Sequence, residues 1–299
     1  MKQIVFVSGK GGTGKSTLVA SLTLLVENAV FADCDVDAPN LHLLLPGEDL
    51  LRQDYSGGSI ANIDPDKCVR CGLCRQVCRF DAIDENFVVH PTACEGCAAC
   101  TVMCPTQAIT LYPALTGETR VTQTDRGVFS HAQLAIGADG SGKLVTQVRK
   151  NLFDYTKGED WVLIDGSPGT GCVVIASITG TDAAVVVAEP TPSGRHDLLR
   201  VLSVADHFRV PAFVCINKHD LNPELTAAIE NDCEERKVPV IGKIPYQPEV
   251  VRALRRGQTP VEAGIEDVVE PIRHLWAQLV QALDTPAEDN QEIRHGKTL

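Results

Sequence analysis

The chain has 299 residues, with 27 Lys and Arg against 39 Asp and Glu, a formal net charge of −12, and 12 cysteines. This length predicts one large domain or two smaller ones, and the acidic balance argues against a non-specific binder of nucleic acid or anionic membranes. The apolar stretches are too short for a transmembrane helix, and no signal peptide precedes the first predicted strand. We therefore expect a cytoplasmic protein that binds no nucleic acid and does not insert stably into membranes.

Short apolar runs alternate with helix-length amphipathic stretches along most of the chain. This pattern predicts an α/β fold with a mostly parallel sheet flanked by helices, because strands buried on both faces are continuously apolar. The predicted strands are Gln3–Val7, Ala29–Ala32, Trp161–Ile164, Ala183–Val187, Ala212–Ile216 and Val240–Ile244. The predicted helices are Lys15–Glu27, His196–His207, Glu224–Arg236, Glu249–Arg256 and Asp267–Leu283. Between them, Gly117–Lys150 predicts a hairpin, a loop and a returning helix.

The first strand leads directly into a loop that matches the phosphate-binding pattern G-x-x-x-x-G-K-[ST]. Its residues are Gly9, Lys10, Gly11, Gly12, Thr13, Gly14, Lys15, Ser16 and Thr17. Glycines permit a backbone that aims successive N–H groups at a phosphate, and the loop opens a helix whose dipole favours anions. We expect Lys15 to reach the β- and γ-phosphates of a nucleotide and the Ser16 hydroxyl to bind Mg²⁺.

Carboxylates follow two of the predicted strands. Asp33, Asp35 and Asp37 come after the second strand, where they could hold the waters of a Mg²⁺ ion or orient the water that attacks a phosphate. We expect Asp35 to orient that water and the other two to assist the metal, although any of them could instead cap the next helix. Asp165 ends a later apolar strand and is expected to bind Mg²⁺ through water, with the Gly169 N–H against the γ-phosphate.

The phosphate loop resembles, through its extra lysine Lys10, the deviant Walker A motif of the MinD/ParA and nitrogenase iron protein superfamily of P-loop ATPases. The resemblance implies that Lys10 reaches across a nucleotide-sandwich dimer to the partner's phosphates. Lys10, Lys15 and Asp35 are therefore the expected catalytic residues. A homodimer, or a heterodimer with a paralogue, is the expected assembly across the nucleotide.

The same resemblance places Asn217 and Pro245 beside the adenine of ATP, because each follows an apolar strand as in that family. The segment Asn217–Asp220 also fits the Asn-Lys-x-Asp pattern that reads guanine. The residues alone leave GTP open, and the family favours ATP. Cys172 lies near the position of a cluster-binding cysteine of the nitrogenase iron protein, with a buried packing residue as the alternative.

Eight of the 12 cysteines lie in a block that interrupts the alternation of strands and helices. The spacing Cys-x-x-Cys-x-x-Cys-x-x-x-Cys occurs twice, and in such runs three thiolates bind one [4Fe–4S] cluster while the fourth binds the other. The predicted ligands are Cys68, Cys71, Cys74 and Cys104 for cluster 1, and Cys94, Cys97, Cys100 and Cys78 for cluster 2. Zinc is the alternative, although four-cysteine zinc sites usually use two separated pairs. The block resembles a bacterial two-cluster ferredoxin.

These interpretations together predict a discontinuous P-loop ATPase domain (1–59 and 112–284), an inserted small α+β ferredoxin domain (60–111) and a polar tail (285–299). The expected cofactors are two [4Fe–4S] clusters, ATP and Mg²⁺, and the expected partner is a redox or metal-cofactor protein. Three roles stay open. The chain could gate electron transfer to that partner, assemble or carry a metal cofactor as Mrp-like ATPases do, or serve as a MinD- or ParA-like positioning scaffold.

Overall fold

The structure is a computed structural model that describes residues 1–284, so the predicted polar tail lies outside the described residues. The chain divides into two compact units, each of which is described by itself. The first, called the sheet unit here, comprises Met1–Leu51, Arg120–Ala132 and the described residues from Ser141 onward. The second, called the cysteine unit, comprises Arg52–Thr119 and Gln133–Gly140.

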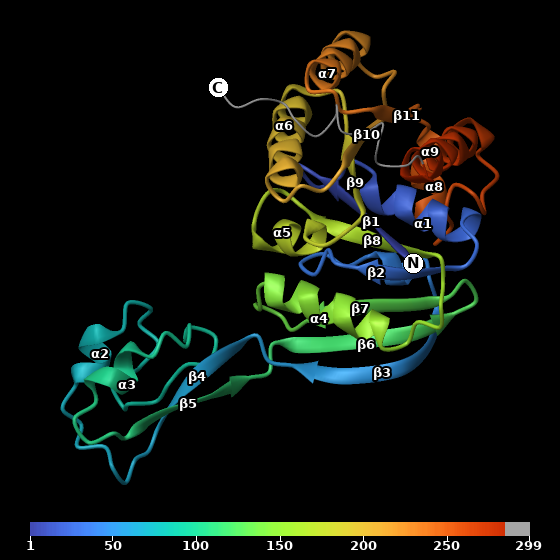
Figure 1. The fold of residues 1–299 in the computed structure, drawn as a ribbon. Coiled ribbons are helices and arrows are strands. Elements are labelled where there is room, and N and C mark those ends of the chain that lie inside the picture. The colour runs from blue at the N-terminus through green and yellow to red at the C-terminus, as the bar shows by residue number, and fades with distance from the viewer. Residues whose placement is uncertain (285–299) are drawn as a thin grey trace. The chain divides into compact units, whose positions relative to one another are not determined.

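A nine-stranded sheet has the order β11-β10-β9-β1-β8-β2-β7-β6-β3 (Figure 1). Its strands are β1 (Lys2–Ser8), β2 (Ala29–Asp33), β3 (Gly47–Tyr55), β6 (Gly117–Thr124), β7 (Val128–Leu134), β8 (Trp161–Pro168), β9 (Ala183–Ala188), β10 (Ala212–Asn217) and β11 (Val240–Ile244). Every neighbouring pair from β11 to β7 is parallel. The predicted α/β fold with a mostly parallel sheet is thereby confirmed.

Helices cover both faces of this sheet, with α1 and α9 on one face and α4 to α7 on the other (Figure 1). Their bounds are α1 (Lys15–Leu25), α4 (Gly142–Phe153), α5 (Cys172–Ile178), α6 (Pro192–His207), α7 (Pro223–Glu235), α8 (Pro248–Leu254) and α9 (Glu266–Asp284), with a 3₁₀ turn η1 (Leu41–Leu43). The helix predicted from His196 begins four residues earlier, because the Thr191 side chain caps it by accepting the Gly194 N–H at 3.0 Å. None of the described helices is long and apolar enough to cross a membrane.

The core of the sheet unit forms where the apolar strands meet the helices. Phe6, Phe31 and Leu163, from β1, β2 and β8, are completely buried, and so are Leu22 of α1 and Leu275 of α9. These contacts fix the strand ends and the loops that follow them. The β3 strand was not predicted, because it is exposed along nearly its whole length and lacks an apolar pattern.

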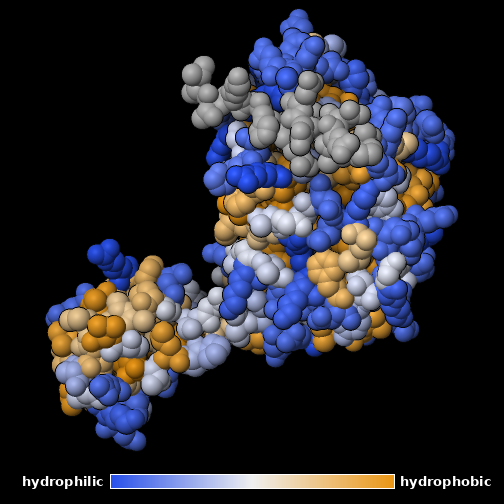
Figure 2. All heavy atoms as spheres, viewed as in Figure 1, coloured by the Kyte–Doolittle hydropathy of each residue, from blue (hydrophilic) through white to orange (hydrophobic). Residues whose placement is uncertain are grey.

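The cysteine unit has a much smaller apolar interior. Its antiparallel strands β4 (Gly58–Ile63) and β5 (Ile109–Ala114) accompany two short helices, α2 (Leu73–Val77) and α3 (Ala99–Met103). The four buried residues that pack together are Ala61, Cys74, Ile83 and Ile109, with Cys94, Cys100 and Cys104 partly buried against them. Figure 2 shows much apolar surface on the face of this unit that it presents. The exposed apolar side chains of the unit include those of Val69, Phe80, Val102 and Met103.

Candidate functional site

The glycine-rich loop between β1 and α1 adopts a backbone that only glycine accommodates easily. Gly12 and Gly14 have φ angles of 82° and 92°, in the left-handed region that disfavours a side chain. A Cβ atom on Gly14 would also collide with the side-chain amide of Asn217. The loop therefore depends on glycine for two separate reasons at the residue that precedes α1.

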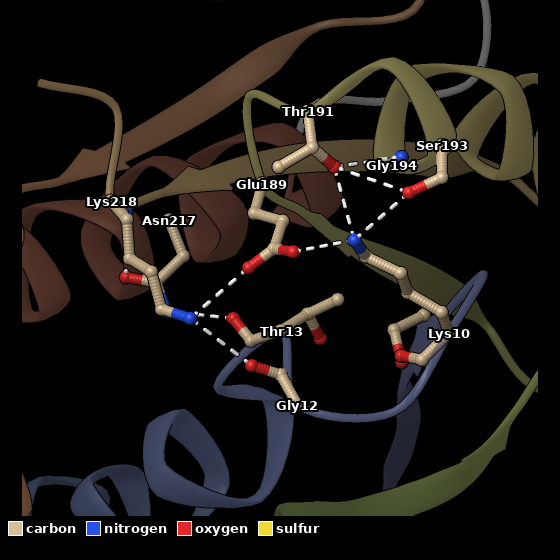
Figure 3. Close-up of polar contacts among 10 residues, drawn as sticks. Lys10, Gly12, Thr13, Glu189, Thr191, Ser193, Gly194, Asn217 and Lys218 are labelled. Atoms are coloured by element: carbon tan, nitrogen blue, oxygen red, sulfur yellow. Dashed lines mark hydrogen bonds and ion pairs between the residues drawn. The ribbon is translucent and has the colours of Figure 1, made fainter. Parts of the chain in front are cut away.

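Residues at the end of β10 and directly after it support this loop from the other side. The Asn217 amide donates to the Thr13 carbonyl oxygen at 2.7 Å, and the Lys218 ammonium donates to the Gly12 carbonyl oxygen at 3.2 Å (Figure 3). The segment also contacts the end of β11, since the Tyr246 N–H donates to the Asp220 carboxylate at 2.7 Å. The residues predicted to hold the base, Asn217 and Pro245, thus belong to two loops that are joined beside the phosphate loop.

Lys15 is the buried cation of the site. Its Nζ lies 2.6 Å from Oδ1 of Asp165 and 3.6 Å from Oδ2 of Asp35, with the lysine side chain only 5% exposed. Burial disfavours the charged ammonium, but attraction by Asp165 and Asp35 outweighs it and raises the pKa of Lys15. The structure therefore brings together three residues that the sequence assigns to catalysis and Mg²⁺.

Asp165 has unused hydrogen-bonding capacity. Its carboxylate is completely buried, yet Oδ2 has no hydrogen-bond partner among the described residues, and the same holds for the buried Thr13 hydroxyl. An unpaired buried carboxylate oxygen is unfavourable unless a ligand supplies a donor. Oδ2 is therefore suited to a metal-bound water, and the half-buried Ser16 follows Lys15 in the first turn of α1. These residues fit a hydrated Mg²⁺.

The three carboxylates after β2 have different surroundings. Both oxygens of the buried Asp33 accept backbone N–H groups, from Asp35 at 3.0 Å, Asn40 at 3.2 Å and Leu41 at 3.1 Å. These hydrogen bonds hold the loop after β2, although the N-cap of the following 3₁₀ turn is Asn40 rather than an aspartate, and metal assistance by Asp33 stays a prediction. Burial and repulsion by Asp165 raise the pKa of Asp33 to about 8, against the attraction of Lys15. Burial also raises the pKa of Asp35, whereas Asp37 is exposed.

Two predicted phosphate contacts are occupied within the chain. The Gly169 N–H donates to the Ser8 carbonyl oxygen at 2.8 Å, so it is not a free donor in this conformation. The Lys10 ammonium lies 2.5 Å from the Glu189 carboxylate and also donates to the hydroxyls of Thr191 and Ser193 (Figure 3). The sequence placed Glu189 in a segment that could close over the nucleotide or form a helix-entry turn, but it did not indicate that this carboxylate pairs with Lys10.

The eight clustered cysteines divide between two cavities of the cysteine unit. One cavity is lined by Cys68, Cys71, Cys74 and Cys104, and the other by Cys78, Cys94, Cys97 and Cys100. Among the described residues, no three His, Cys, Asp or Glu side chains converge tightly enough to hold a single metal ion. Each cavity nevertheless contains the four cysteines that the repeat assigns to one cluster, including the crossed fourth residue.

The crossed cysteines make equivalent contacts in the two halves of the repeat. The Sγ of Cys78 accepts the Ala82 N–H at 3.4 Å, and the Sγ of Cys104 accepts the Ala108 N–H at 3.2 Å. Cys104 also lies 3.7 Å from the Thr106 hydroxyl. Burial opposes ionisation of Cys104, but these hydrogen bonds lower its pKa.

Cys172 is exposed at the start of α5, which does not fit the alternative of a buried packing residue.

Comparisons with known proteins bear on the nucleotide-binding part of the site. Residues 4–261 match the sequence profile described as the CobQ/CobB/MinD/ParA nucleotide binding domain. An uncharacterised protein of Methanocaldococcus jannaschii is 35% identical over 231 residues, which cover 74% of this chain and 79% of that protein. An iron-sulfur cluster carrier protein of Pyrococcus furiosus is 23% identical over 312 residues, covering 97% and 89% of the two chains. The fold resembles MinD of Pyrococcus horikoshii, solved with Mg-ADP, at a TM-score of 0.57, 19% identity and coverage of 95% and 99%.

Proposed function

Since the chain belongs to the CobQ/CobB/MinD/ParA family of nucleotide-binding domains, we propose that it is an ATP-hydrolysing, nucleotide-switched dimer that gates electron transfer through two [4Fe–4S] clusters to a partner protein. The observation that carries the proposal is the combination of a phosphate loop in the sheet unit with two separate four-cysteine cavities in the cysteine unit.

The nucleotide part rests on the buried contacts of Lys15. A lysine that already neutralises Asp165 and approaches Asp35 is placed to exchange those contacts for the phosphates of ATP. Asp165, through the unpaired Oδ2, and Ser16 would hold hydrated Mg²⁺, which would neutralise charge on the phosphates. Asp35 would orient the attacking water, because its Oδ2 lies 3.6 Å from Nζ of Lys15, whereas both oxygens of Asp33 already accept backbone N–H groups.

The cluster part rests on the way the cysteines are distributed. A cubane separates its four thiolates more widely than a single zinc ion does, because each thiolate binds a different iron. The eight cysteines line two cavities in the crossed grouping of the repeat, whereas four-cysteine zinc sites usually use two separated pairs, and this favours clusters over zinc. When bound, the clusters would supply one-electron transfer, and the N–H groups of Ala82 and Ala108 would stabilise negative charge on their crossed sulfurs.

The second candidate function is a carrier or assembly ATPase for an iron–sulfur or other metal cofactor. It is favoured by the similarity to the Pyrococcus furiosus carrier protein over nearly the whole chain. Mrp-type carriers, as the sequence resemblance implies, hold a bridging cluster on a C-terminal Cys-x-x-Cys pair, and this chain has no cysteine after Cys233. The electron-gating function is therefore preferred.

An anaerobic redox titration followed by electron paramagnetic resonance tests the proposal. Potentials of both clusters are measured with ADP and then with a non-hydrolysable ATP analogue. A shift of about 30 mV or more, on the order of 0.7 kcal/mol for a one-electron couple, would show that the nucleotide state reaches the clusters. Equal potentials, together with transfer of iron to an apo-acceptor, would support the carrier function instead.

A further inference from the structure

Lys10 has a complete set of partners on its own chain. Its Nζ pairs with Oε1 of Glu189 at 2.5 Å and donates to Oγ1 of Thr191 at 3.0 Å and to Oγ of Ser193 at 3.1 Å. An ammonium group has three N–H donors, and these three oxygens can accept all of them. As Figure 3 shows, the lysine points from the phosphate loop toward the start of α6.

Glu189 connects Lys10 to the opposite side of the phosphate loop. Its second oxygen, Oε2, pairs with Nζ of Lys218 at 3.0 Å, and the same ammonium donates to the Gly12 carbonyl oxygen. The carboxylate is only 15% exposed. Burial opposes ionisation, but hydrogen bonds from Lys10 and Lys218 outweigh it and hold the pKa of Glu189 below its usual range. The side chain is therefore a carboxylate shared between two lysines.

The two lysines of the phosphate loop, Lys10 and Lys15, thus form ion pairs with different carboxylates. Lys15 lies against Asp165 and Asp35, the residues expected at the Mg²⁺ and the attacking water, while Lys10 lies against Glu189. Lys10 must give up its three acceptors before its charge becomes available to a phosphate elsewhere. Breaking these contacts costs free energy. Binding of a nucleotide phosphate by Lys10 is therefore weaker by the free energy of the contacts that it gives up.

We propose that Glu189 is a positioning residue that holds Lys10 in a resting site on its own chain and thereby sets the nucleotide concentration at which the dimer forms. The proposal rests on the proposed function, in which Lys10 binds phosphates across the dimer. Weakening the resting contact enlarges the fraction of chains ready to dimerise, so less nucleotide is needed.

The substitution Glu189→Gln tests the proposal, because it keeps the shape of the side chain and removes its charge. The half-maximal concentration of a non-hydrolysable ATP analogue for dimer formation is measured by sedimentation velocity. We expect a value roughly 3- to 10-fold lower than in the wild type, as for loss of one charge-assisted hydrogen bond. An unchanged or higher value would overturn the proposal.

The matched control is Glu230→Gln, which removes the same charge from an ion pair with Lys243 at 2.9 Å on α7 and β11. It should leave the half-maximal concentration unchanged. Ser193→Ala, which removes one neutral acceptor of Lys10, should shift the concentration about 2-fold in the same direction. The Ser193→Ala variant serves as the test if the Glu189→Gln variant does not fold.

A second measurement reports on Lys10 directly. Trace acetylation of the nucleotide-free wild type and of Glu189→Gln is quantified by mass spectrometry at each lysine. We expect faster labelling of Lys10 in the variant, and equal labelling would contradict the resting site. If the wild type fails to dimerise at any analogue concentration, the proposed function fails. If it dimerises and Glu189→Gln matches it, only the role of Glu189 fails.

Discussion

The two units of the chain are stabilised in different ways. In the sheet unit, Phe6, Phe31 and Leu163 are completely buried within a continuous apolar core. In the cysteine unit, the central cluster has only four buried residues, and cysteines make up much of what surrounds them. Burial of apolar surface can therefore account for the first fold, whereas the proposed clusters would supply the second with stabilisation that its small apolar interior lacks.

The largest expected effect follows from removal of iron. After anaerobic treatment with a chelator, the amide hydrogens of residues 60–111 should lose protection from exchange, because the cysteines no longer have metal to bind. Those of β1, β8 and β9 should keep theirs, and the sheet unit should still bind nucleotide. Hydrogen exchange read by mass spectrometry separates the two outcomes. Equal loss of protection in both units, or none in the cysteine unit, would remove the distinction drawn between them.

The next prediction concerns a position where the sheet unit depends on geometry rather than on burial. Gly14→Ala should lower the free energy of unfolding by about 1–3 kcal/mol, because φ is 92° and the new methyl group meets Asn217. Thermal unfolding without nucleotide is the measurement. Gly11→Ala is the control, since its Cβ would meet no atom within 4 Å. A similar loss in both variants would mean that the strain at Gly14 has been misjudged.

Much of the sheet unit could be predicted because its signals are local. Unbroken apolar runs such as Ala183–Val187 indicate buried parallel strands, and the glycine and lysine spacing indicates the phosphate loop. All six predicted strands and all five predicted helices are present, with ends that differ by up to four residues. The cysteines also group around two cavities in the sets that the repeat predicts, whereas their binding to clusters stays a prediction.

What the sequence did not indicate depends on contacts between distant segments. Glu189 meets Lys10 and Lys218 only because α6 and β10 pack beside the phosphate loop. The backbone contacts of Asp33 form because the chain after β2 folds back on that carboxylate. Neither arrangement has a spacing pattern, so the residue types alone favoured a metal ligand for Asp33 and left a helix cap as the alternative.

A smaller effect is expected at a polar contact of the sheet unit. Arg195 on α6 binds Asp232 on α7 through two hydrogen bonds, of 2.5 and 2.8 Å. Asp232→Asn should lower the free energy of unfolding by about 0.5–1 kcal/mol at pH 7, a modest value because the Arg195 side chain is 42% exposed and water screens the pair. Arg195 holds the pKa of Asp232 below its usual range, so its stabilisation is present above about pH 4 and lost as the pH falls.

Denaturant unfolding at pH 7 and at low pH checks this prediction, and the difference between wild type and variant should disappear at low pH. The control is Asp206→Asn, at an aspartate near the end of α6 that forms no ion pair with the described residues. A loss of stability that does not change with pH would assign the effect to packing rather than to charge.

The smallest predicted effect distinguishes the two halves of the cysteine repeat. Thr106 contacts the crossed cysteine Cys104, whereas the exposed Phe80 stands at the equivalent place in the first half. A hydroxyl that donates to a cluster sulfur favours the more negative, reduced state, so Thr106→Val should lower the potential of cluster 1 by roughly 20–40 mV, under about 1 kcal/mol for one electron. Thr101→Val is the control, because its hydroxyl donates to the Ala98 carbonyl oxygen. An equal shift in both clusters would show that the contact at Cys104 does not distinguish them.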